Sequence, residues 1–183
     1  IHLMHDINGT CYAVPVSETP LYGKECPSYE NVLKSKKEYA VSVRIEQDEQ
    51  DHIRGKLLKQ SHGNMMLVQN PPMSPLTRDE LDLVYSLPYT REYHPMYEEF
   101  GGVPGLEEVK FSITHNRGCF GACNFCSLAF HQGRFVTSRS KMSVLAEAEK
   151  LKQLPDFKGY IHDVGGPTAN FRYPSCEKQL KSG

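Results

Sequence analysis

The sequence predicts a mixed α/β fold in two parts, an α+β segment with a β-hairpin and a following βαβ unit. Two short β-type runs, residues 56–60 and 65–69, flank a four-residue connection that contains glycine, which is typical of a hairpin. After a glycine-rich hinge at residues 101–105, a strand, a helix and a second strand follow one another. We therefore predict a domain boundary at this hinge, with residues 1–105 on one side and 106–183 on the other.

In the first part, the hydrophobic spacing predicts two further elements before the hairpin and one after it. Residues 29–39 show a loose helical pattern, and residues 41–45 alternate apolar with polar side chains, which predicts a half-buried strand. After the hairpin, Thr77 and Glu80 have the spacing of a capping box, in which each side chain hydrogen-bonds the backbone of the other residue. A short helix should begin there.

The second part predicts the βαβ unit more sharply. Residues 109–114 and 160–164 read as strands, and apolar residues at spacings of three and four predict an amphipathic helix over 141–154. A crossover between parallel strands is almost always right-handed. Both strands should therefore end at the same edge of one sheet.

Composition and charge exclude several classes of protein. The 183 residues carry 21 basic and 22 acidic side chains, so no long-range field would attract nucleic acid or an anionic membrane. The longest apolar runs hold four residues, far short of a membrane span. Three of the six cysteines fall within eight positions, which indicates a metal site in a reducing compartment. We expect a cytoplasmic protein, of which this chain, beginning at Ile1, is an excerpt.

Three cysteines in the loop after the first βαβ strand are candidate metal ligands. Cys119, Cys123 and Cys126 form a C-x3-C-x2-C pattern, and Gly118 and Gly121 allow the backbone to bend tightly around one metal centre. Three unligated core thiols fit this loop less well, because it is glycine-rich and polar. The sequence therefore predicts a metal-binding loop.

Two kinds of metal centre fit these cysteines. A structural zinc ion takes four nitrogen or sulfur ligands, and His131 or Cys176 could complete the set in a zinc-stabilised interaction module. A four-iron cluster held by only three thiolates instead leaves one iron open to a small molecule. A third alternative is an iron-sulfur electron-transfer protein, in which the cluster has four protein ligands.

The cysteine spacing, with Phe125 before the last cysteine, resembles the cluster loop of radical SAM enzymes. The chain also resembles the YgiQ family of radical SAM proteins over most of its length after about residue 40. The segments that carry this resemblance are Val68–Pro72, Leu87–Arg91, Arg117–Gly121, Phe130–Arg134 and Asp163–Asn170.

The resemblance implies the beginning of a (β/α) radical SAM barrel, preceded by an accessory segment. It implies a [4Fe-4S] cluster on the three cysteines, with S-adenosylmethionine at the free iron. One electron, from a donor such as a flavodoxin or ferredoxin, would cleave this cofactor to methionine and a 5′-deoxyadenosyl radical. The radical would abstract hydrogen from a substrate that the sequence does not specify. The excerpt alone is expected to be inactive.

The resemblance also implies cofactor contacts outside the cysteines. Phe125 is one candidate, by its place in the cluster loop. Family members usually have Gly-Gly-Glu near the end of the second strand, where the backbone meets the methionine amino group. Here Pro167 takes the third position and brings neither a backbone donor nor a carboxylate. Only the backbone role is therefore carried over, to Gly165 and Gly166, with Asp163 as a weaker candidate.

Overall fold

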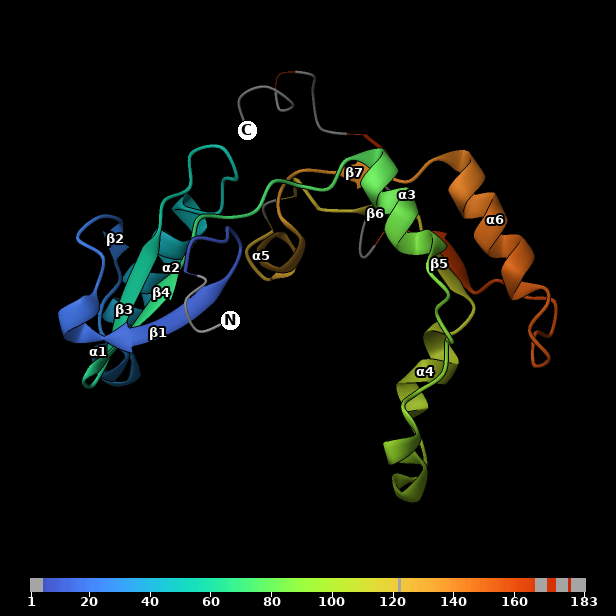
Figure 1. Ribbon diagram of the computed structural model, residues 1–183, viewed down its shortest axis with the longest axis horizontal. Helices are drawn as coiled ribbons and strands as arrows, with labels where there is room; N and C mark the ends of the chain where they lie inside the picture. Colours follow the sequence, from blue (N-terminus) through green and yellow to red (C-terminus); the bar gives the residue numbers. More distant parts are fainter. Residues whose placement is uncertain (1–4, 122, 167–170, 174–177, 179–183) are drawn as a thin grey trace. The chain divides into compact units, whose positions relative to one another are not determined.

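The computed structural model describes residues 5–121, 123–166, 171–173 and 178. The chain divides into two compact units, one comprising the residues up to Pro75 and the other beginning at Leu76 (Figure 1). The division lies ahead of the expected boundary at residue 105, which falls inside the second unit and stays a prediction. Both units contain helices and strands, so the fold is mixed α/β.

The first unit is built on a four-stranded sheet in the order β1-β4-β3-β2. Its strands are β1 (Cys11–Pro15), β2 (Lys24–Glu25), β3 (Leu58–His62) and β4 (Met65–Gln69). The predicted hairpin is confirmed, since β3 and β4 are antiparallel. His62 pairs with Met65, so the connection has two residues rather than four, and Gly63 adopts the positive φ of 58° that such a tight turn needs.

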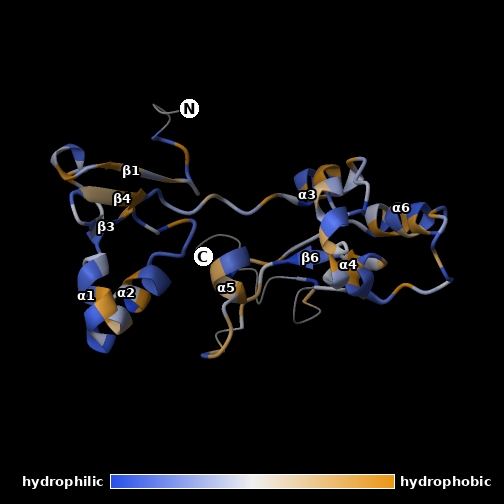
Figure 2. Ribbon diagram, turned by 90° about the horizontal axis from the view of Figure 1, so that it is seen from below, coloured by the Kyte–Doolittle hydropathy of each residue, from blue (hydrophilic) through white to orange (hydrophobic). Residues whose placement is uncertain are grey.

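The core of the first unit follows from alternation along the strands. Met66 and Val68 of β4 point to the same face, and they cluster with Val14 of β1 and with Leu57. Figure 2 shows hydrophobic colour along β1 and β4, whereas β3 is largely hydrophilic. β4, one of the two central strands, therefore supplies two of the four cluster residues, and β3 adds the buried Leu58 at its start.

The predicted strand at residues 41–45 is wrong. These residues lie within α2 (Lys36–Asp48), which follows α1 (Tyr29–Lys34). Ser35 caps α2 by accepting a hydrogen bond from the Glu38 amide. This capping residue indicates a helix start, but the apolar alternation at residues 41–45 favoured a strand. The one fully buried side chain in this stretch is the polar Ser42, whereas Val41 is exposed and Val43 and Ile45 are half-buried, so the apolar alternation does not mark a buried strand face.

The second unit holds most of the helices. The first unit also contains the short helix η1 (Val16–Glu18). The helices of the second unit are α3 (Arg78–Ser86), η2 (Pro95–Phe100), α4 (Pro104–Val109), α5 (Leu128–Gln132) and α6 (Lys141–Leu151). The capping box of Thr77 and Glu80 at the start of α3 is confirmed. In the described part of the chain, no helix is both long enough and apolar enough to cross a membrane.

Two short sheets in the second unit position the cysteine loop. β5 (Ser112–Thr114) pairs in parallel with β8 (Asp163–Gly165), and β6 (Asn116–Arg117) pairs antiparallel with β7 (Thr137–Ser138). The parallel pair with α6 between its strands confirms the predicted strand-helix-strand order. Both strands are shorter than predicted. Val109 belongs to α4, whose first turn is set by Pro104 at a position that favours a helix start.

Candidate metal centre

The cysteine loop follows β6, and two hydrogen bonds donated by backbone amides close its base. The Cys119 amide donates to the Gly133 carbonyl at 3.0 Å, and the Gly118 amide donates to Oε1 of Gln132 at 3.2 Å. Gly118 has a φ of 87°, and a Cβ there would lie 1.9 Å from the carbonyl oxygen of Phe135. The chain can therefore enter the loop only with glycine at this position.

Two of the three candidate sulfur atoms converge on Gly121. A Cβ at Gly121 would lie 3.4 Å from Sγ of Cys119 and 3.8 Å from Sγ of Cys123, so the glycine leaves space between the thiols. Cys126 follows within the same loop, and its amide donates to the Cys123 carbonyl at 3.1 Å. Three soft thiol donors in one loop have the chemistry that iron-sulfur clusters require of their ligands.

Among the residues that the structure describes, no three His, Cys, Asp or Glu side chains are close enough to hold one metal ion. Metal binding couples to local folding, so binding of one metal centre by all three thiols would bring their sulfur atoms together.

The remaining loop candidates differ in exposure. Phe125 is 93% exposed, which leaves its ring available to a ligand or partner. His131 lies in α5 and is exposed. Cys176, the other suggested fourth zinc ligand, lies outside the described residues, as does Pro167.

Gly165 and Gly166 lie at the end of β8, beside the end of β5. Gly165 is opposite Thr114 in the parallel register and is buried. Its carbonyl accepts a hydrogen bond from the His115 amide at 2.9 Å. Asp163 begins β8 and is exposed. The strand that leads to the cysteine loop and the strand that ends in Gly165 therefore finish side by side.

Two contacts join the chain after β8 to this region, one from the cysteine loop and one from β7. The rings of Phe120 and Phe171 stack with their centroids 3.9 Å apart. The Ser138 hydroxyl of β7 donates to the Arg172 carbonyl at 2.5 Å. These contacts hold the residues after β8 against the base of the loop.

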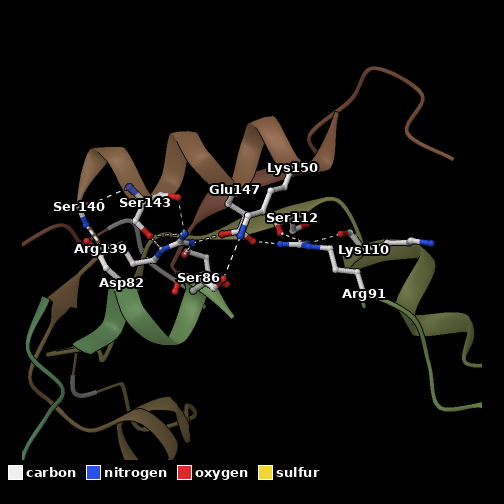
Figure 3. Close-up of polar contacts among 11 residues, drawn as sticks. Asp82, Ser86, Arg91, Lys110, Ser112, Arg139, Ser140, Ser143, Glu147 and Lys150 are labelled. Atoms are coloured by element: carbon white, nitrogen blue, oxygen red, sulfur yellow. Dashed lines mark hydrogen bonds and ion pairs between the residues drawn. The ribbon is translucent and has the colours of Figure 1, made fainter. Parts of the chain in front are cut away.

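A buried ionic network supports the strand ends (Figure 3). Arg139 is 1% exposed and pairs with Glu147 of α6, which also pairs with Arg91. Arg139 also donates to the Thr114 carbonyl at the end of β5, at 2.8 Å, and its guanidinium lies 4.2 Å from the Tyr85 ring centroid. Burial lowers the pKa of Arg139, although an arginine remains protonated at neutral pH. The network fixes β5 against α6.

A family comparison identifies the chain's membership. Residues 1–112 match the family described as radical SAM N-terminal. The chain belongs to this family. The match covers the accessory part and ends before the cysteine loop, close to the predicted domain boundary. No solved structure matches the chain.

Curated relatives match most or all of the chain. A UPF0313 protein of Clostridium botulinum (strain Okra / Type B1) is 57% identical over 87% of this chain and 25% of its own length. Another from Clostridium botulinum (strain 657 / Type Ba4) is 52% identical over 100% of the chain and 29% of its length. A third, from Clostridium perfringens (strain ATCC 13124), is 52% identical over 97% of the chain and 27% of its length. These are YgiQ-family proteins, as the sequence resemblance indicated, and the chain spans about a quarter of their length.

Sequence reasoning missed two features of this region. Arg139 and Glu147 are eight residues apart, and no local pattern marks them as a buried pair. Asn116 is fully buried at the start of the loop, a position that depends on the β6–β7 pairing. For Asn116, the sequence offered one signal, the polar run of residues 114–117 between the predicted strand and Cys119.

Proposed function

We propose that this chain is part of a radical SAM enzyme and contains the cluster loop and the first two strands of its (β/α) barrel. In this proposal Cys119, Cys123 and Cys126 hold a [4Fe-4S] cluster, and S-adenosylmethionine binds at the iron without a protein ligand. Membership of the radical SAM N-terminal family supports the proposal. The observation that carries it is the parallel pairing of β5 with β8, which brings the strand before the cysteine loop and the strand ending in Gly165 to one edge.

In this proposal, different residues at this edge bind the cluster and the two ends of the cofactor. Three thiolates supply ligands to the cluster, which when bound provides the electron for reductive cleavage of S-adenosylmethionine. Gly165 and Gly166 offer backbone groups to the amino-acid end of the cofactor, because the absence of a Cβ permits close approach. Phe125, exposed on the loop, offers an aromatic face to the adenosyl end.

The proposal includes an electron donor and leaves the substrate open. A small redox protein such as a flavodoxin or ferredoxin would reduce the cluster. Cys123 and Phe125 are exposed on the loop, which supports electron entry at that surface. The substrate and the reaction are properties of the whole protein. This chain spans about a quarter of the length of its curated relatives.

Anaerobic reconstitution of the full-length protein with iron and sulfide tests the cluster. We expect a brown protein with about four irons per chain and visible charge-transfer absorption. Cys123→Ala should lose this absorption, whereas Cys11→Ala, which removes an exposed cysteine of the first unit, should keep it. A colourless protein with stoichiometric zinc under these conditions would contradict the proposal and favour a zinc-stabilised module.

A further inference from the structure

Asn116 carries a fully buried amide that lacks a hydrogen-bond partner. The residue is 0% exposed, and within the described part of the chain neither Nδ2 nor Oδ1 has a partner. Buried polar groups are nearly always hydrogen-bonded, because an unpaired one destabilises the fold. Real proteins break this rule at functional sites, where a bound molecule can supply the missing partner.

The strand register places this amide on the face of the ribbon that contacts the chain after β8. Asn116 is directly opposite Ser138, so the two side chains share one face of the β6–β7 ribbon. The Ser138 hydroxyl binds the Arg172 carbonyl on that face, and the adjacent Phe171 stacks on Phe120 of the cysteine loop. The Asn116 amide therefore lies on the same face of the ribbon as the contact between Ser138 and Arg172.

The unpaired atoms define the chemistry of the missing partner. A carboxamide offers a carbonyl acceptor and an NH2 donor side by side, and in Asn116 both are unpaired. The partner must therefore donate and accept at adjacent positions. The α-ammonium group of an amino acid donates and its α-carboxylate accepts, so one amino-acid end satisfies both atoms.

We propose that Asn116 is a binding residue for the amino-acid end of S-adenosylmethionine. This inference rests on the proposed function, which has that end of the cofactor between the cysteine loop and Gly165. Because Asn116 has no exposed surface in the ligand-free chain, the cofactor reaches it by displacing part of the segment at Phe171 and Arg172.

The test measures binding of S-adenosylmethionine to the full-length, cluster-loaded protein by anaerobic equilibrium dialysis. Asn116→Leu keeps the size of the side chain and removes both polar atoms. We expect its affinity to fall about tenfold or more, with the visible cluster spectrum unchanged. The melting temperature of the cofactor-free protein should hold or rise, because the variant removes an unpaired buried amide. If the leucine variant does not fold, Asn116→Ala removes the same atoms without added bulk.

Thr137→Val provides the matched control. Thr137 also has a buried hydroxyl without a partner among the described residues, but it pairs with Arg117 and so lies on the other face of the ribbon. Its affinity for S-adenosylmethionine should equal that of the wild type. A wild-type affinity in Asn116→Leu, or an equal loss in both variants, would overturn the inference.

Two further measurements separate the parts of this inference. Competition by free methionine should weaken in Asn116→Leu while competition by adenosine is unchanged, and the reverse result would overturn the assignment to the amino-acid end. If the wild-type protein takes up no cluster or binds no S-adenosylmethionine, the proposed function fails and this inference fails with it. If the wild type binds and the leucine variant binds equally, only the inference fails.

Discussion

At the scale of single residues, Gly118 decides whether the cysteine loop can form. Its φ of 87° and the 1.9 Å approach of the Phe135 oxygen leave no room for a side chain. Gly118→Ala should destabilise the fold by about 2 kcal/mol or more, because left-handed backbone strain adds to a steric clash. Urea unfolding measures this change, and cluster uptake should fall with it.

Gly133→Ala is the matched control for this prediction. Gly133 also has a positive φ, 79°, but no atom would lie within 4 Å of its Cβ. It should therefore show backbone strain without the clash and lose less stability than Gly118→Ala. Equal losses in the two variants would show that the close approach at Gly118 is unimportant.

The carboxyl group of Asp82 gives the second unit a pH-dependent contact. Burial raises the pKa of Asp82, but hydrogen bonds from Ser140 and Ser143 outweigh this effect, so the pKa lies below its ordinary value. Its stabilising contribution is therefore complete above the unfolded pKa, about 4. It is lost as the pH falls through the folded pKa.

Asp82→Asn tests this contact. We expect the variant to be less stable than wild type at pH 7 by about 1 kcal/mol, with the difference shrinking below pH 4. Chemical denaturation across this pH range measures it. A difference that stays constant with pH would show that the charge of Asp82 does not contribute.

Local residue signals were predictable from sequence, and long-range ones were not. The capping box of Thr77 and Glu80 involves residues three positions apart, and the cysteine pattern spans eight. In contrast, the pairing of Arg139 with Glu147 and Arg91 depends on how α6 packs. The burial of Asn116 depends likewise on the β6–β7 register, which no local pattern specifies.

At the scale of elements, the same distinction explains the success of the hairpin and the failure at residues 41–45. The hairpin has a glycine turn between two β-type runs, so local and tertiary preferences agree. In residues 41–45 the apolar alternation predicted a strand, yet the Ser35 cap begins α2 and Ser42 bonds Glu46 one turn along. The capping signal at Ser35 therefore determines the structure of residues 41–45, and the short apolar alternation does not.

The contact between β5 and α6 depends on Glu147. This side chain is buried and accepts from two arginines, so its removal leaves two guanidinium groups without their carboxylate partner. Glu147→Ala should lower the free energy of unfolding by about 3–5 kcal/mol. Glu149→Ala on the same helix removes an exposed ion pair with Lys152 and should change it by about 0.5 kcal/mol or less.

Chemical denaturation of the two variants provides the comparison. A larger loss in Glu147→Ala than in Glu149→Ala supports a role for the buried network in holding the end of β5. Similar small losses in both would contradict that role and would leave the strand end supported by its backbone pairing alone.

At the scale of the whole molecule, cluster binding should reorganise one part of the chain. The three thiols are not gathered in the described structure, so loading must draw the cysteine loop together. Amide hydrogen exchange over residues 118–133 should slow at least about tenfold on anaerobic reconstitution, while residues 58–69 in the first unit serve as an unchanged reference. Equal exchange in both states would contradict coupling between the metal and the loop.

Which family the chain belongs to was predictable because its cysteine pattern and several short segments are local in sequence, and the family comparison confirms that prediction. The boundary at residue 105 and the barrel remain predictions. Two paired strands do not specify a barrel, and the compact units divide at Pro75 instead.

The central claim is that the three-cysteine loop holds a cluster whose open iron binds S-adenosylmethionine. Electron paramagnetic resonance of the reduced, reconstituted full-length protein tests it most directly, because the spectrum reports both the cluster and its ligands. The account predicts a [4Fe-4S] signal that shifts when S-adenosylmethionine is added and is absent in Cys123→Ala. A signal that S-adenosylmethionine leaves unchanged, or no iron-sulfur signal at all, would contradict it.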